Sequence, residues 1–272
     1  MSGTQHVKLG RNLHGYAGET LDISSVLAEC SAAARVGGWI VERIPAMPKT
    51  DLLALNRPCC AAPKSDAPSG RACRSVYISA EIHGDEPAGP LAVLRLLQEN
   101  SLPAWLNLWV CPCLNPTGFA LNRRENGDGL DLNRQYLDPG AEEVIAHVRW
   151  LHSVPDFDLC LCLHEDWESH GFYIYELNPD GRPSVADHVV DRVSRVCPID
   201  RSERIEGRPA YGGVIRPDTE VLSRPQWPEA FYLLSHKTRL SYTLEAPSDF
   251  PLSTRVAALV EAVKAAVEAE SS

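Results

Sequence analysis

Strand-like and helix-like apolar patterns alternate through residues 76–113 of this 272-residue chain, and this alternation constrains the fold more than any other feature. Residues 76–82 and 106–113 are apolar runs with β-branched and aromatic members, which are typical of buried strands. Residues 88–99 lie between them and carry leucines at helical spacing, after a proline suited to a first helical turn. A strand, a helix and a strand in this order favour a mostly parallel sheet covered by helices.

Similar patterns continue on both sides of this stretch. They predict helices at 21–36, 141–152, 183–197, 228–237 and 253–270, and strands at 39–44, 52–55, 158–163 and 241–246. Residues 198–228 contain many prolines and glycines and are expected to form loops. We interpret 56–75 as a surface connection, because the strands after it need the earlier ones as neighbours. We therefore expect one domain, residues 1–272, in which 1–75 lead into the sheet.

The bulk composition excludes several classes of protein. A net charge of −10 argues against a nucleic acid partner. No apolar run approaches the about 20 residues that span a bilayer, and the N-terminus lacks the apolar core of a secretory signal. The nine cysteines show no framework spacing, so we expect reduced thiols and a cytoplasmic location. Cys111 with Cys113, and Cys160 with Cys162, have strand spacing, and we expect buried side chains there rather than a structural metal.

The turn after the first of these strands contains two residues that are common metal ligands. His83 and Glu86 are three residues apart across a strand-to-helix turn, so their side chains can point at one spot. An imidazole nitrogen and a carboxylate oxygen together suit zinc. Two ligands do not make a catalytic zinc site, however, and a surface turn that happens to contain His and Glu is the alternative.

His164 supplies a third ligand, because it ends the apolar run 158–163 in the same way. The carboxyl ends of strands in open α/β sheets are where ligands bind, so two strand-end histidines can meet. His83, Glu86 and His164 then form a three-ligand site for one Zn²⁺ per chain, with a fourth position open for water. Nickel or cobalt would also fit this set of ligands.

Two further groups have residue types that suit catalysis. Glu245 lies near the end of the apolar strand 241–246, where a carboxylate is costly unless it is paired or functional. Beside a zinc site it suits a general base, and an ion-paired structural role is the alternative. Arginines and Asn133 crowd the polar segment 115–135, and arginine suits bidentate binding of a carboxylate. On its own this segment would be interpreted as a solvated basic loop.

These elements, in their order along the chain, resemble the zinc metallocarboxypeptidases. The elements are HGDE at 83–86, NPTG at 115–118, RRENGDGLDLNR at 123–134, the strand-end His164 and TLE at 243–245. The resemblance covers about residues 76 to 250 and implies a three-layer α/β/α sandwich around a mixed, mainly parallel sheet. It implies that His83, Glu86 and His164 hold zinc, and that Arg124 polarises the scissile carbonyl. It also implies that Asn133 and Arg134 bind the substrate's terminal carboxylate, and that Glu245 is the general base and later the general acid.

The expected activity is therefore zinc-dependent hydrolysis of an amide bond next to a free carboxylate, in a peptide or murein peptide. The HGDEPAG and DLNR elements also look like the aspartoacylase and succinylglutamate desuccinylase branch, so deacylation of N-acyl amino acids is the alternative. A zinc-dependent binding protein without turnover is a remote one. No tyrosine stands in the context of the family's substrate-capping Tyr, although Tyr211 and Tyr232 are candidates.

An acidic cluster near the expected zinc site is unusual for this family. It consists of Asp85, Glu165, Asp166 and Glu168. Three roles are open to these carboxylates: to neutralise arginine, to hold a second metal, or to bind a substrate amine. We favour the simpler interpretation that Asp85 and Glu165 point elsewhere.

Overall fold

One mixed eight-stranded sheet organises the computed structural model, which describes residues 21–47, 50–59, 73–217 and 223–269. Its strand order is β1-β2-β4-β3-β5-β10-β6-β9. The four central strands, β4, β3, β5 and β10, are parallel, whereas β1, β2 and β6 pair antiparallel to their inner neighbours. The strands are β1 (Ile40–Met47), β2 (Thr50–Arg57), β3 (Arg74–Ala80), β4 (Leu106–Cys111), β5 (Leu159–Asp166), β6 (Tyr173–Leu177), β9 (Val214–Ile215) and β10 (Ser241–Pro247).

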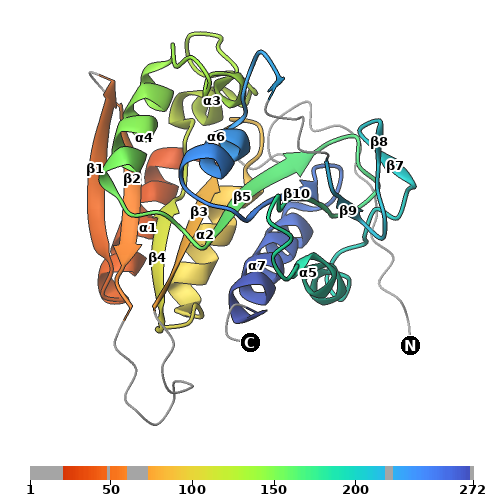
Figure 1. Cartoon of the computed structure of the whole chain (residues 1–272). Helices are drawn as coiled ribbons and strands as arrows, with labels where there is room; N and C mark the ends of the chain where they lie inside the picture. Colours follow the sequence, from red (N-terminus) through yellow and green to blue (C-terminus); the bar gives the residue numbers. More distant parts are fainter. Residues whose placement is uncertain (1–20, 48–49, 60–72, 218–222, 270–272) are drawn as a thin grey trace.

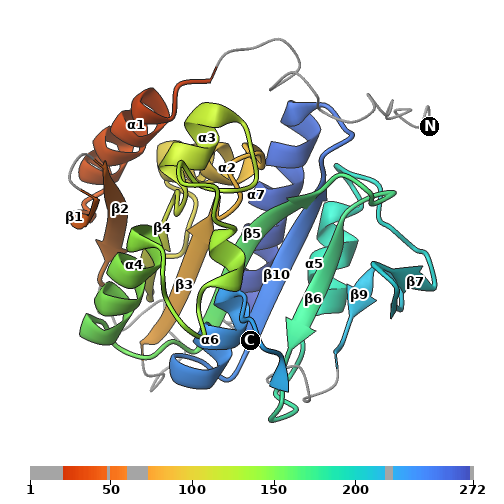
Figure 2. The same ribbon diagram turned by 90° about the horizontal axis from the view of Figure 1, so that it is seen from above.

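Helices cover both faces of this sheet (Figures 1 and 2). One face carries α1 (Ile23–Val36), α2 (Ala88–Glu99), α5 (Ala186–Val193) and α7 (Leu252–Ala269). The other carries α4 (Glu142–Ser153) and α6 (Glu229–His236). The short α3 (Pro116–Leu121), the 3₁₀ turn η1 (Leu132–Arg134) and the hairpin of β7 (Arg204–Ile205) and β8 (Arg208–Pro209) complete the described elements. The predicted three-layer α/β/α sandwich is confirmed.

The two faces have separate apolar cores because side chains alternate along each strand. On β5, Leu159, Leu161 and Leu163 pack under α2 and α7, while Cys160 and Cys162 pack under α4 and α6. His164 continues the Cys160 and Cys162 series, and Glu165 continues the leucine series. Neighbouring residues at this strand end therefore face opposite layers.

All the predicted helices and strands are present, with ends that differ by a few residues. The sequence prediction failed in the segment between β5 and α6. β6 was not expected, and 198–228, expected to be loops, contains β7, β8 and β9. Three of these strands have two residues each, which is too short for an apolar period to appear.

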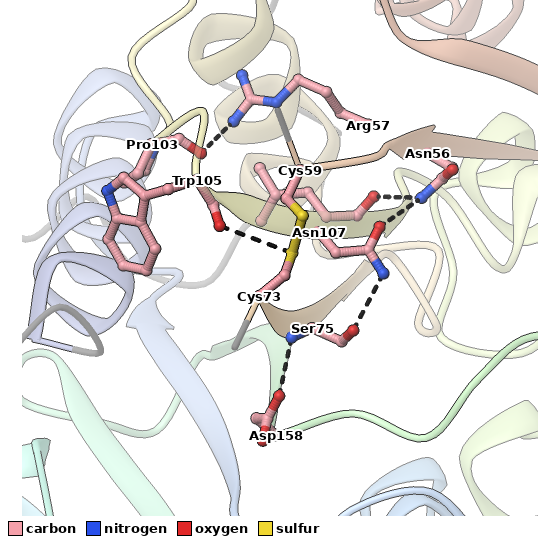
Figure 3. The surroundings of a disulfide bond; sticks show 10 residues. Asn56, Arg57, Cys59, Cys73, Ser75, Pro103, Trp105, Asn107 and Asp158 are labelled. Carbon is pink, nitrogen blue, oxygen red and sulfur yellow. Dashed lines mark hydrogen bonds between the residues drawn. A yellow bond between two sulfur atoms is a disulfide. The ribbon is translucent and has the colours of Figure 1, made fainter. Parts of the chain in front are cut away.

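The expectation of reduced thiols is wrong for Cys59 and Cys73, which form a disulfide between the end of β2 and the start of β3 (Figure 3). The Cys73 Sγ also lies 3.7 Å from the Trp105 carbonyl oxygen. Ser75 of β3 is tied to the residue before β5, because its N–H donates to Asp158 Oδ2 at 2.8 Å. In the sheet, β4 lies between β2 and β3, the two strands that the disulfide links.

The strand cysteines behave as expected. Cys111, Cys113, Cys160 and Cys162 are unpaired and fully buried among apolar side chains. Burial raises the pKa of the Cys160 and Cys162 thiols well above the ordinary value, so they remain protonated. In the part of the chain that the structure describes, no helix combines the length and apolarity needed to cross a bilayer.

Candidate metal centre and catalytic site

The structure brings His83, Glu86 and His164 together at the carboxyl ends of β3 and β5. His83 Nδ1 lies 2.5 Å from Glu86 Oε1, and His164 Nδ1 lies 3.0 Å from Glu86 Oε2. All three residues are buried, and one ligand atom of each lies within 4.8 Å of the others. Each imidazole thus points its Nδ1 atom at the Glu86 carboxylate. The three residues together offer two nitrogen ligands and one oxygen ligand. That set fits a zinc ion.

The electrostatics of this triad favour a cation. Burial lowers the pKa of both imidazoles, but the Glu86 carboxylate outweighs it, so the pKa of His83 and of His164 is raised. Burial opposes ionisation of Glu86, yet the two histidines lower the pKa of its carboxyl well below the usual range. The anionic Glu86 carboxylate therefore stabilises positive charge at the centre of the triad.

Glu245 lies beside this triad on β10. It occupies the register position opposite His164 in the parallel β10–β5 pair, and it faces the same side of the sheet. Burial raises the pKa of its carboxyl well above the ordinary value, with nearby acidic groups adding to the effect and His164 opposing it. A half-buried carboxylate with a raised pKa, next to a metal centre, has the properties of a general base.

Arg124 and Asp131 form an ion pair next to His83. Arg124 Nε bonds Asp131 Oδ2 at 2.9 Å, and Arg124 Nη1 lies 3.4 Å from His83 Nδ1. Asp131 Oδ1 lies 3.7 Å from His83 Nε2, so this carboxylate faces both groups. The neighbouring Arg123 instead donates to the carbonyl oxygens of Asn126 and Gly127. The structure therefore distinguishes the two arginines, and Arg124 is the one at the centre.

The NPTG element holds the ligand turn against the Arg124 loop. The Asn115 amide nitrogen donates to the carbonyl oxygens of Ile82 (3.1 Å) and Arg124 (3.2 Å), and its oxygen accepts from the Gly118 N–H at 2.9 Å. Gly84 packs so closely that a Cβ there would lie 2.0 Å from the Gly118 carbonyl carbon. Any larger residue at position 84 would push the His83–Glu86 turn away from Arg124.

Asn133 and Arg134 follow in the same segment and line the same cavity. Asn133 is buried, and its oxygen accepts the backbone N–H of Glu229 at 2.8 Å, which leaves the amide nitrogen as a donor. Arg134 is exposed, and among the described residues its guanidinium has no carboxylate partner; it donates to the Asn133 carbonyl oxygen. Both side chains are thus placed to offer N–H donors to an anion.

Comparison with known proteins agrees with this geometry. Residues 72–188 match the model of the succinylglutamate desuccinylase/aspartoacylase catalytic domain. Over 68 residues the chain is 35% identical to carboxypeptidase SOL1 of Arabidopsis thaliana, a match that covers 21% of this chain and 14% of that protein. The resemblance to the carboxypeptidase A-like superfamily is confirmed. These matches support a metal-dependent hydrolase of that superfamily.

Solved structures share the carboxypeptidase-like fold over most of the chain. A candidate metallopeptidase of Shewanella amazonensis superposes with a TM-score of 0.74 at 24% identity, covering 91% of this chain and 93% of its own. A metallo-carboxypeptidase of Pseudomonas aeruginosa, in complex with (2-guanidinoethylmercapto)succinic acid, gives 0.61 at 20% identity, covering 90% and 69%. At these identities the likeness establishes the fold alone.

Neither candidate for the substrate-capping tyrosine lines the cavity. Tyr211 is 82% exposed and outside the cavity, and Tyr232 is buried, with its hydroxyl on His152 Nε2 at 2.7 Å. Tyr175 on β6 lines the cavity instead, and its hydroxyl donates to Glu206. Sequence analysis missed Tyr175, because β6 was not predicted.

The acidic cluster divides between the two faces of the sheet. All four residues line the cavity, but the carboxylate of Glu165 bonds away from it, to the Ala88 N–H of α2 and to Arg255 of α7. Within the described residues, the structure assembles one set of three metal ligands, the triad itself. The idea of a second metal therefore gains no support. The expectation that Glu165 points elsewhere agrees with its bonds to Ala88 and Arg255, and the expectation for Asp85 stays a prediction.

Proposed function

We propose that this protein is a zinc-dependent hydrolase that cleaves an amide bond next to a free carboxylate, as a metallocarboxypeptidase that removes a C-terminal residue from a peptide or murein peptide. One observation carries the proposal. The ligand triad, Glu245, Arg124 and Arg134 all line a single cavity. A metal centre, a base, an oxyanion donor and a carboxylate donor are the parts such a reaction needs.

Each residue then has a defined task. A zinc ion held by the triad would supply Lewis-acid activation of water and of the substrate carbonyl. Glu245 takes a proton from the attacking water and later gives it to the leaving amine. Arg124, fixed by Asp131, donates hydrogen bonds to the carbonyl oxygen as negative charge develops there, and loss of one such donor commonly costs about 3–4 kcal/mol of barrier. Asn133 and Arg134 hold the free carboxylate and set the position of the scissile bond.

The cavity supports a peptide as the substrate. Its volume of about 1030 Å³ is at the upper end of the range for small-molecule sites. A small N-acyl amino acid would leave most of it to water, whereas several peptide residues would fill it. The succinic acid ligand of the Pseudomonas aeruginosa neighbour fits a substrate with free carboxylates. The match of residues 72–188 to the desuccinylase/aspartoacylase domain favours N-acyl amino acid deacylation as the second candidate.

A mixed substrate panel, read by mass spectrometry, tests the proposal. Zinc-loaded protein is incubated with C-terminally free peptides, murein tripeptide, N-acetylaspartate and N-succinylglutamate, with metal-stripped protein as the control. We expect loss of a C-terminal residue that disappears on metal removal and returns with zinc. Release of acetate or succinate would establish the deacylase instead. Tight binding of these compounds without turnover would indicate a binding protein and overturn the proposal.

A further inference from the structure

Glu165 follows the candidate ligand His164 but faces the other layer of the sheet. Its side chain is fully buried under α2 and α7, although a carboxylate in such a place is costly unless it is paired. On β10 its register partner is Ala246, the apolar neighbour of Glu245. The carboxylate thus belongs to the residue next to a candidate ligand, and the proposed reaction gives it no task.

Two contacts from different helices stabilise this carboxylate. Oε1 accepts the backbone N–H of Ala88 at 2.7 Å, and Oε2 accepts from Arg255 Nη1 at 2.5 Å. Ala88 is the first residue of α2, whose N-terminal Pro87 provides no side-chain cap. Glu165 of strand β5 therefore supplies the missing cap for the N-terminus of α2, at the positive end of the helix dipole. Arg255 belongs to α7 and is 2% exposed, so the ion pair is buried on both sides.

The contact with Ala88 joins the two segments that carry the ligands. Ala88 lies two residues after Glu86, and Glu165 lies one residue after His164. We propose that Glu165, through its bond to the Ala88 N–H, is a positioning residue that fixes the distance between Glu86 and His164 and so preorganises the metal centre. This inference rests on the metal site of the proposed function, but it concerns the site's geometry rather than the substrate.

Two double variants separate positioning from simple folding. Glu165→Met with Arg255→Met removes both charges and the acceptor for Ala88, and replacing a buried ion pair by apolar side chains is often neutral for stability. Glu165→Gln with Arg255→Met also removes both charges but keeps an amide oxygen that can accept from Ala88. Outer-shell partners of metal ligands typically contribute about 10–100-fold in metal affinity. Because Glu165 bonds neighbours of the ligands rather than the ligands themselves, we expect about 10-fold in the first variant, the lower end of that range, and a clearly smaller loss in the second.

The matched control joins the same two helices at their other ends. Lys264 Nζ of α7 bonds Glu99 Oε2 of α2 at 2.7 Å, far along the helix from Ala88. Lys264→Met should leave the zinc affinity unchanged, because no ligand segment is involved. Three measurements are made on every variant: the zinc dissociation constant by chelator competition, the visible spectrum of the cobalt form, and the melting temperature without metal.

The outcomes are distinct. A weakened zinc site and an altered cobalt spectrum in the Met/Met variant, with near-wild-type values in the Gln/Met variant, would support the proposal. Wild-type affinity and spectrum in both, or equal losses in both with unchanged melting temperatures, would overturn it. Wild-type protein that binds zinc but cleaves no amide would overturn the proposed function and leave the positioning role intact. Wild-type protein that binds no zinc would overturn both.

Discussion

Glu245 and His164 occupy opposite positions on the neighbouring parallel strands β10 and β5. On its other side β10 pairs antiparallel with β6, and there Glu245 lies opposite Tyr173. Side chains at opposite positions of paired strands point to the same face. The proposed base is therefore held by the sheet one strand away from a proposed metal ligand, and no loop is needed to position it.

Glu245→Gln should remove catalysis and leave the metal centre. The amide keeps the size and polarity of the side chain but cannot accept the proton, and general base catalysis typically contributes about 10²–10⁴-fold. We expect kcat to fall by at least about 100-fold while the zinc content stays at that of the wild type. Steady-state kinetics and metal analysis of the same preparation measure both. A near-wild-type kcat would exclude Glu245 as the base.

Arg134→Ala should weaken binding of substrates with a free carboxylate. Arg134 is exposed at the cavity and lacks a carboxylate partner among the described residues, so substrate would pair with it directly. A hydrogen bond to a charged group is worth about 1.5–3 kcal/mol, which corresponds to a KM increase of roughly 10–100-fold with little change in kcat. C-terminally amidated substrates are the control. Equal losses on free and amidated substrates would contradict the anchoring role.

The sequence predicted the centre of the site because its residues sit at strand ends. His83, His164 and Glu245 each follow or close an apolar run, and parallel strands bring their carboxyl ends to one edge. Long-range contacts that have no pattern in the sequence were not predictable. The bonds of Asp131 to Arg124 and of Glu165 to Arg255 depend on how separate elements pack. β6 was missed because it has only five residues and Glu176 interrupts its apolar run.

His147 should make stability depend on pH. It is 1% exposed on α4, with the Tyr77 hydroxyl 2.8 Å from Nε2 and the Tyr136 hydroxyl 2.7 Å from Nδ1. Burial lowers the pKa of His147 to about 3. Below its unfolded-state pKa of about 6.5, the unfolded chain binds a proton that the native protein excludes, so this contribution falls as the pH drops from about 6.5 toward 3.

The difference between wild type and His147→Gln isolates this effect. Between pH 6.5 and 4.5 we expect the metal-free wild type to lose about 2–3 kcal/mol more unfolding free energy than the variant, because the other titrating groups are common to both. Urea unfolding at the two pH values provides the measurement. Parallel losses in the two proteins would show that His147 is protonated in the native state or that its pKa is unshifted.

The Cys59–Cys73 disulfide should stabilise the fold measurably. It closes a sequence separation of 14 residues, and cross-linking a loop of that length contributes about 3 kcal/mol by restricting the unfolded chain. Thiol titration in denaturant without reductant should find at most seven of the nine cysteines, because Cys59 and Cys73 are paired, and nine after reduction. Cys59→Ser with Cys73→Ser should lower the unfolding free energy by about 3 kcal/mol. Reductant should destabilise the wild type by a similar amount and leave the double variant unaffected, whereas nine thiols before reduction would disprove the bond.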